Sequence, residues 1–160
     1  MKRDASWLHQ LLDEIWDQYF ADVPQLNDVK IVYGRRAKRR LGSIGLDPAD
    51  RKTSVITMNG IFRNVAIPEY VVKATIVHEL THYAHGFNSP IEQSRRHPHA
   101  GGVMRREFAE RGLLELFLQQ KRWLKAHWQT IIEAEFPPAK RKTRLTATIK
   151  ATKPFWFIGG

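Results

Sequence analysis

The sequence has no cysteine among its 160 residues. This absence excludes disulfides, thiolate nucleophiles, iron–sulfur clusters and zinc sites built on cysteine. The sequence also lacks an apolar run near the roughly 18 residues of a membrane-spanning helix. Polar residues interrupt its N-terminal segment at His9, Asp13 and Asp17, which is not the pattern of a signal peptide. We therefore expect a cytoplasmic protein without a membrane partner, whose chemistry comes from histidines, carboxylates, hydroxyls, amines or a metal held without sulfur.

Acidic residues are also scarce, because 16 Asp and Glu stand against 26 Lys and Arg, which leaves a net charge of +10. Such a charge attracts nucleic acid, acidic protein surfaces or anionic lipid without choosing among them. Apolar residues make up 42% of the sequence, with 5 Trp, 8 Phe and 4 Tyr, which is enough for a hydrophobic core. The length fits one domain.

The first half of the chain predicts one helix and three strands. Residues 6–20 have a helical apolar period, with Asp4 or Ser6 available as the N-cap. Strand character is concentrated in residues 29–33, 40–46 and 54–62. Because the connections between these strands are short, we expect a small antiparallel three-stranded sheet.

The second half predicts two helical regions. A helix is expected over 68–85, with proline at its start and glycine after its end. A second helical region is expected over 103–136, bent near Gly112 and stopped by two prolines. Between them lies a loop, residues 87–102, whose length is typical of a functional or mobile segment. The predicted fold class is therefore α+β.

The motif that carries chemistry is His78-Glu79-Leu80-Thr81-His82, inside the predicted 68–85 helix. Residues four apart project from one face of a helix, so both imidazoles can bind one zinc ion. Glu79 lies one position round the helix, where it can act as general base toward a bound water. A purely structural zinc site needs no such base.

A catalytic zinc site takes three protein ligands and keeps a position open for water. A metzincin pattern would need glycine at position 85 and histidine at position 88, where this chain has His85 and Asn88. The spacing leaves the third ligand open. The candidates are His85, His97, His99, Glu107 and Glu110.

The stretch from Ile67 to Gly86, IPEYVVKATIVHELTHYAHG, resembles the SprT-like (Spartan-type) zinc metallopeptidases. A following histidine, His99, and an upstream segment, Arg39-Arg40-Leu41-Gly42-Ser43-Ile44, also match that family, and the similarity covers about residues 5–110. The resemblance implies a zincin-like domain over residues 1–138 and a zinc-dependent endopeptidase that acts on a protein or peptide substrate. It implies that His99 is the third zinc ligand, beside His78 and His82.

Two features depart from the family. The third histidine stands in His97-Pro98-His99-Ala100-Gly101-Gly102 rather than in the usual His-Gly context, which keeps His97 as an alternative ligand. The C-terminal zinc ribbon of many members is absent, because it needs cysteines. In its place the chain ends in a basic tail, residues 139–160, with no acidic residue.

Two basic clusters predict contact with DNA or RNA through phosphates. Their residues are Arg35, Arg36, Lys38, Arg39 and Arg40 in the first cluster, and Lys140, Arg141 and Lys142 in the second. Some members of the resembled family act on proteins attached to DNA, which favours this interpretation. The alternative functions are a nucleic-acid-binding module with a structural or vestigial zinc site, and a zinc hydrolase acting on a non-peptide bond. The oligomeric state is left open.

Overall fold

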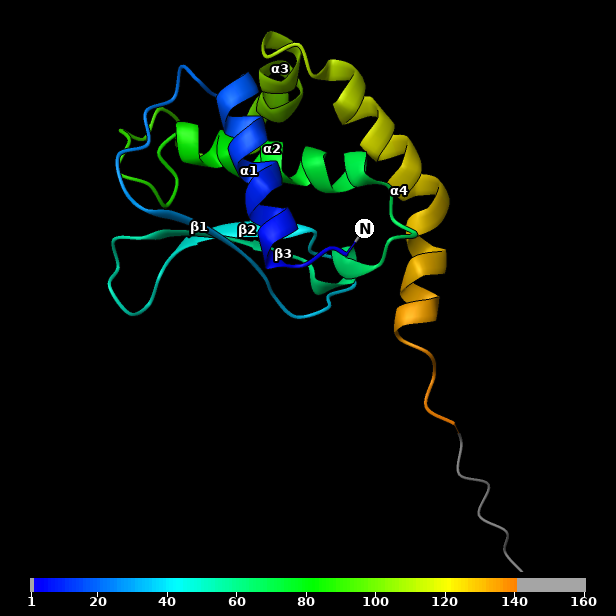
Figure 1. Cartoon of the computed structure of the whole chain (residues 1–160). Helices are drawn as coiled ribbons and strands as arrows, with labels where there is room; N and C mark the ends of the chain where they lie inside the picture. The colour runs from blue at the N-terminus through cyan, green and yellow to red at the C-terminus, as the bar shows by residue number, and fades with distance from the viewer. Residues whose placement is uncertain (1, 141–160) are drawn as a thin grey trace, which may run out of the picture.

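The computed structural model describes residues 2–140 of the chain, which form four α-helices, a three-stranded sheet and two short 3-10 turns (Figure 1). The α+β class predicted from the sequence is confirmed. In chain order the elements are α1 (Ala5–Tyr19), β1 (Val29–Tyr33), β2 (Gly42–Leu46), β3 (Ser54–Met58), η1 (Gly60–Arg63), α2 (Glu69–Ala84), η2 (Ala100–Gly102), α3 (Val103–Glu110) and α4 (Leu114–Glu135).

The sheet is mixed, with strand order β1-β3-β2, so the prediction of an antiparallel sheet is wrong. Strand β3 runs parallel to β1 and antiparallel to β2, and Ile56 at its centre is opposite Ile31 on one side and Ile44 on the other. The prediction failed because short connections do not make β1 and β2 neighbours. The chain after β1 passes the central position, which β3 then fills. Strand β2 is left at the edge of the sheet.

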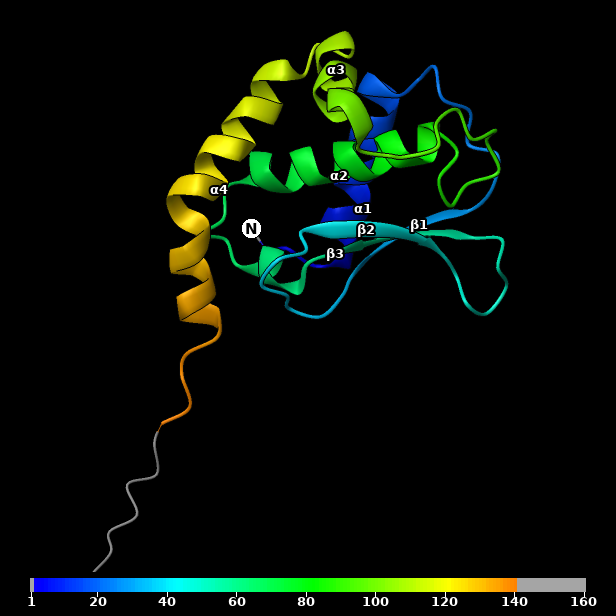
Figure 2. The same ribbon diagram turned by 180° about the vertical axis from the view of Figure 1, so that it is seen from behind.

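Helices α1 and α2 cover the same face of the sheet, as Figures 1 and 2 show from opposite sides. Helix α1 is capped by Asp4, whose carboxylate accepts a hydrogen bond from the Trp7 backbone N–H at 3.0 Å. The core between these layers contains side chains without solvent exposure, among them Leu8, Phe62 and Ile56. Burying each of them stabilises the fold by about 1.5–3 kcal/mol.

Helix α2 is enclosed on almost every side, and eleven of its sixteen residues are buried. It starts after Pro68, whose fixed φ suits a helix start, and it ends before Gly86, which has a φ of +82°. It contacts the sheet, α1, α3 and α4. The groups that α2 presents are therefore held by packing on several sides rather than by one amphipathic stripe.

Helices α3 and α4 are separated at Gly112, which has a φ of +74° and breaks the helix as predicted. Gln120 ties α4 to α2, because its amide donates hydrogen bonds to the Val71 carbonyl at 3.0 Å and to the Thr75 hydroxyl at 2.9 Å. Further along α4, the Trp128 indole N–H donates to the Lys38 carbonyl at 2.8 Å. Helix α4 thus fixes both α2 and the basic segment after β1.

Asn59 organises that basic segment, although the sequence predicted a strand continuing through this position. Its amide donates to the carbonyls of Ala37 and Arg40 at 2.7 and 2.8 Å, while its side-chain oxygen accepts from the backbone N–H groups of Ala37 and Ile61. The chain then turns into η1 instead of extending β3. Asn59 therefore sets where Arg40 enters β2. Within residues 2–140, no helix has the length and apolar character of a membrane span.

Candidate metal centre

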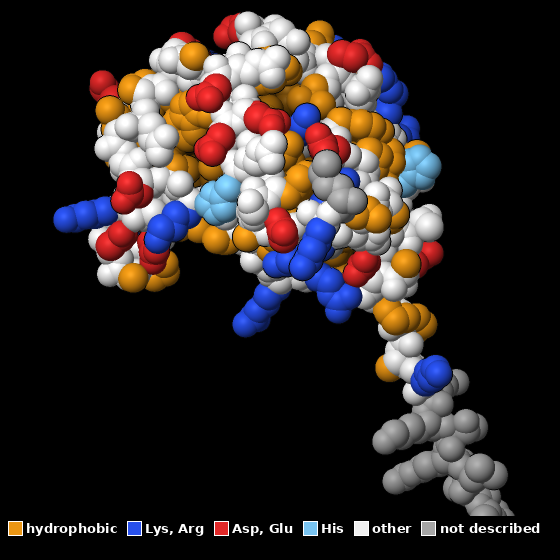
Figure 3. Space-filling view, viewed as in Figure 1, with side chains coloured by type: hydrophobic (Ala, Val, Ile, Leu, Met, Phe, Trp, Pro, Cys, Tyr) orange, Lys and Arg blue, Asp and Glu red, His pale blue; other side chains and the backbone are white. Residues whose placement is uncertain are grey.

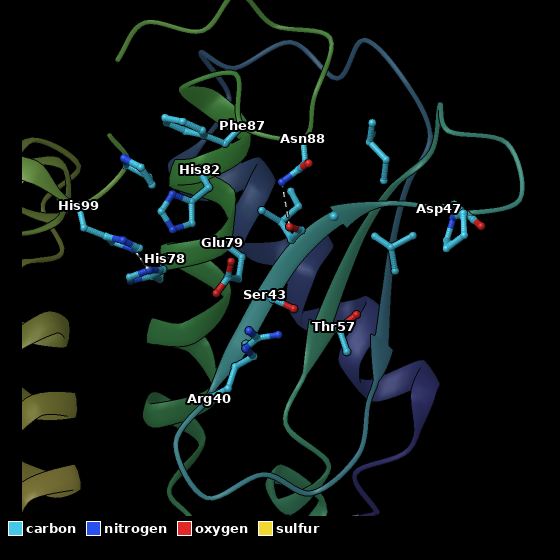
Figure 4. Close-up of a pocket in the computed structure, with 17 residues that line it drawn as sticks. Arg40, Ser43, Asp47, Thr57, His78, Glu79, His82, Phe87, Asn88 and His99 are labelled. Carbon is cyan, nitrogen blue, oxygen red and sulfur yellow. Dashed lines mark hydrogen bonds between the residues drawn. The ribbon is translucent and has the colours of Figure 1, made fainter. Parts of the chain in front are cut away.

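Three histidines converge beside helix α2 (Figure 4). His78 and His82 lie one turn apart on the helix, with ring centroids 4.8 Å apart. His99 comes from the loop before η2, and its ring centroid is 5.2 Å from that of His78 and 4.7 Å from that of His82. Each residue offers one nitrogen such that the three lie within 4.8 Å of one another. This cluster is close enough to hold a metal ion.

The loop that carries His99 turns sharply before α3. Gly101 and Gly102 have φ values of +64° and +69°, a region that glycine adopts without strain. The other end of the loop is tied down where the Ser94 backbone N–H donates to the His85 carbonyl at 3.1 Å. The loop is thereby folded back along α2, and His99 itself is exposed.

The other third-ligand candidates lie outside the cluster of three found among the described residues. His85 instead contacts Glu107, with 2.8 Å between its Nε2 and a carboxylate oxygen, and Glu107 also lies 3.6 Å from Arg111. These three residues form a bridge between the end of α2 and α3. His97 and Glu110 are exposed.

The three imidazoles fit the chemistry of a bound metal. The Nε2 atoms of His78 and His99 are 3.1 Å apart, near the ~3.4 Å separation expected for two nitrogens around one tetrahedral zinc ion. Burial, followed by the charge of neighbouring histidines, lowers the pKa of His78 to about 3 and that of His82 to about 4. Both rings are neutral at pH 7, which is the form that binds metal. Imidazoles suit several transition metals, so the donors alone do not name the ion.

Glu79 is the carboxylate beside this cluster. Its side chain is 4% exposed, and none of the hydrogen bonds within residues 2–140 involves it. Burial raises its pKa to about 7, and the positive charge of Arg40 opposes that rise. A carboxylate with a pKa near neutrality is matched to accepting and returning a proton at physiological pH.

Gly42 brings strand β2 close to Glu79. A Cβ atom at Gly42 would lie 2.9 Å from the Thr75 methyl carbon and 3.1 Å from a Glu79 carboxylate oxygen. A larger residue at this position would therefore push β2 away from α2. The absence of a side chain at Gly42 lets β2 lie this close to the Glu79 carboxylate.

A groove of about 670 Å³ runs between β2 and the cluster of His78, His82 and His99, here called the metal cluster (Figure 4). Besides the strand, its walls include His78, Glu79, His82, Phe87, Asn88, Pro98 and His99, and Figure 4 shows Arg40 at one end and Asp47 at the other. The three histidines and Glu79 therefore open onto one space. The arrangement suits an elongated ligand lying along the strand.

Strand β2 has free hydrogen-bonding groups along this groove. At the two ends of the β2–β3 pairing, the Asn59 N–H donates to the Leu41 carbonyl and the Asp47 N–H donates to the Thr53 carbonyl. Residues of an antiparallel strand point alternately toward and away from the paired strand, so the backbone groups of Gly42, Ile44 and Leu46 point away from β3. Of these, the Ile44 carbonyl accepts a hydrogen bond from the Asn88 amide at 3.1 Å. Within the described residues no further strand pairs with this edge.

The basic residues predicted to bind nucleic acid are divided by the structure. Arg35, Arg36, Lys38, Arg39 and Arg40 are all exposed on the segment after β1. On the face seen in Figure 3, lysines and arginines gather at the lower edge of the molecule. Among the basic residues of the segment after β1, only Arg40 lines the metal groove. Lys140 is exposed at the end of the described part, whereas Arg141 and Lys142 lie outside the described residues.

Three residues of the site were not singled out from the sequence. Phe87 packs edge-on to His82, with ring centroids 6.0 Å apart, and Asn88 bonds to β2. Gln120 reaches the same region from α4. Asn88 has a φ of +52°, and nothing in the local sequence pattern distinguishes it or Gln120 from ordinary polar residues.

Comparisons with protein-family models, with curated proteins and with solved structures find no match for this chain. Membership of the SprT-like family therefore stays a prediction from the residues quoted above.

Proposed function

We propose that this protein is a zinc-dependent endopeptidase of SprT-like type, with His78, His82 and His99 as zinc ligands and Glu79 as general base. The observation that carries the proposal is the convergence of three imidazoles and one buried carboxylate on a single groove. Three ligands leave a coordination position for water, which distinguishes a catalytic site from a closed structural one.

Zinc, when bound, would polarise a water and a substrate carbonyl. Glu79 supplies the proton chemistry: an oxygen of its carboxylate accepts the proton of the attacking water and later delivers it to the leaving amine. Its burial suits both steps, because a carboxyl whose pKa is about 7 is neither a permanent anion nor a permanent acid at neutral pH.

The free edge of β2 supplies the place for a polypeptide. An extended peptide can add to an exposed sheet edge through main-chain hydrogen bonds, which tolerate different side chains. The outward groups of Gly42 and Leu46, and the free N–H of Ile44, face the groove for this purpose. Antiparallel addition is the more stable pairing, so we propose that the substrate runs antiparallel to β2.

Glu79→Gln tests the mechanism. We expect the variant to bind one zinc ion per chain, as the wild type does, and to lose casein cleavage by at least about 100-fold, since general-base catalysis contributes roughly 10²–10⁴. Zinc content by elemental analysis and cleavage of labelled casein are the two measurements. Glu92→Gln, an exposed charge in the 87–102 loop, is the matched control and should keep both. Casein cleavage retained by Glu79→Gln would reject the mechanism.

We also propose that the basic segment 35–40 contacts nucleic acid. Among residues 2–140, Arg36 is its one side chain with an ion-pair partner, Glu135 at 3.0 Å, and the other cations are available to phosphates. Asn59 and Trp128 donate hydrogen bonds to backbone carbonyls of the segment, so the backbone that carries these charges is fixed in position. The substrate would then be a nucleic-acid-associated protein.

Single-stranded DNA binding as a function of salt tests this second proposal. A variant with alanine at Arg35, Arg36, Lys38 and Arg39 keeps Arg40 and thus the groove. We expect it to bind more weakly and with a slope reduced by roughly 0.7 for each lost phosphate contact. An unchanged slope would rule out this segment as the binding surface.

A further inference from the structure

A second cavity, of about 440 Å³, adjoins the metal groove between α2, the start of β2 and α4. It shares Arg40, Gly42, His78 and Glu79 with the groove. Its remaining walls are Arg39, Leu41, Thr75 and Gln120. A substrate side chain that passes from the groove into this cavity would lie next to Glu79, the proposed general base.

The charges around the cavity favour an anion. Arg39 and Arg40 lie on its wall, and neither has an acidic partner within the described residues. Glu79, the base, is the one acidic residue on the wall. In Figure 4 the Arg40 guanidinium rises from the start of β2 into the space between β2 and α2.

The inner wall suits a side chain with a short apolar stem. Thr75 and Gln120 are already bonded to each other, and the Gln120 amide and the Thr75 hydroxyl both donate to the Val71 carbonyl. Their donors are therefore used within the protein, and Leu41 adds an apolar surface. The charged donors that remain for a ligand are those of the two arginines.

The direction in which a peptide lies along β2 determines which of its residues is next to the second cavity. Strand β2 runs from Gly42 to Leu46, so an antiparallel peptide has its C-terminal part near Gly42 and Arg40. In Figure 4, His78, Glu79 and His82 lie between Arg40, at the start of β2, and Asn88, which bonds to Ile44. The residues after the cleaved bond consequently approach the second cavity.

We propose that this cavity selects the residue following the cleaved bond and that Arg40 binds its carboxylate. The inference rests on the proposed peptidase function and names its preferred substrate class, an acidic peptide. A planar guanidinium matches a carboxylate with two parallel hydrogen bonds. The carboxylate comes from an Asp or Glu side chain or from a free C-terminus at that residue, and both sources offer the same group to Arg40.

Peptide binding to zinc-loaded Glu79→Gln measures this preference without turnover. The probes are fluorescent decapeptides, amidated at the C-terminus, that differ only in Glu, Gln or Lys at the residue after the bond. We expect Glu to bind roughly tenfold more tightly than Gln, and Lys to bind most weakly, since charge-assisted hydrogen bonds are the strong ones. A fourth peptide, ending at that residue with a free carboxylate and a Gln side chain, separates the two sources.

In the Glu79→Gln protein, a second substitution, Arg40→Glu, should abolish the preference for the Glu peptide and favour the Lys peptide. Arg35→Glu makes the same charge change on the same segment but outside both cavities, and it should preserve the preference for the Glu peptide. Arg40→Gln, which introduces no new charge, serves where Arg40→Glu fails to fold. Equal binding of Glu and Lys peptides would overturn the proposal.

Cleavage by the wild type separates the two proposals. If none of the peptides is cut but Glu79→Gln still prefers the Glu peptide, the peptidase function fails and the carboxylate pocket stands. If all are cut with equal kcat/KM, or if the products place Glu before the cleaved bond, the pocket assignment fails while the peptidase function stands.

Discussion

The two sides of the metal cluster are built differently. His78 and His82 are carried by α2, a helix packed against the sheet and three other helices, and His82 is 7% exposed. His99 is exposed on a loop whose direction depends on two glycines with left-handed backbone. The packing of α2 therefore positions two of the three histidines, whereas the third comes from an exposed residue of a loop.

Removing a ligand from each side tests this difference and should give the largest effects. We expect His82→Ala and His99→Ala each to weaken zinc binding roughly a hundredfold to a thousandfold, since four-ligand zinc sites contribute about 10–16 kcal/mol, or about 2.5–4 kcal/mol per ligand. In chelator, His99→Ala should leave the free energy of unfolding within about 0.5 kcal/mol of wild type, whereas His82→Ala lowers it by creating a cavity. Isothermal titration with zinc and denaturant unfolding measure the two quantities.

His97→Ala is the control for the loop, because His97 is exposed, lies two residues from His99 and is outside the cluster. It should bind zinc as the wild type does. Loss of affinity in this variant, with affinity kept in His99→Ala, would assign the third ligand to His97.

In the metal-free protein, the dependence of the free energy of unfolding on pH reports on the buried groups of α2. The folded pKa of Glu79 is about 7, above its ordinary 4.5, so its contribution to stability is present below pH 4.5 and is lost as pH rises toward 7. Between those limits the wild type should lose about 3 kcal/mol relative to Glu79→Gln. Denaturant unfolding of both proteins in chelator from pH 4.5 to 8 measures the difference.

The histidines of α2 act in the opposite direction, because their lowered pKa values make the unfolded chain bind more protons below pH 6.5. Their contribution is lost as pH falls from about 6.5 toward 4. It is common to wild type and Glu79→Gln and cancels in the comparison. A difference between the two proteins that does not change with pH would show that Glu79 is not buried as described.

Local signals in the sequence predicted much of the fold. Val29–Tyr33 was predicted with the bounds of β1, Asp4 was a predicted N-cap, and Gly112 separates α3 from α4. These features depend on apolar period, capping and backbone freedom, which neighbouring residues determine. The order of the strands depends on which segments meet in space, and short connections gave the wrong neighbour.

The candidate site divides in the same way. The pair His78 and His82 follows from helical spacing alone, whereas the 17 residues from His82 to His99 do not determine where a loop returns. His99 was selected through a family resemblance, and the structure places it in the cluster. The approach of Gln120 and the edge position of β2 are products of tertiary packing, and no local pattern signals them.

Two glycines of β2 provide the smallest and most localised comparison, since one lies against α2 and the other does not. A Cβ at Gly42 would meet the stiff, buried Thr75 side chain at 2.9 Å, whereas a Cβ at Gly45 would meet nothing within 4 Å. We expect Gly42→Ala to destabilise the protein by about 2 kcal/mol, the cost of overpacking, and to reduce peptide cleavage by moving β2 from Glu79. Gly45→Ala should leave stability and cleavage near wild type. Thermal unfolding measures the stability and kcat/KM on one peptide measures the cleavage. Equal behaviour of the two variants would mean that β2 does not need its close approach to Glu79.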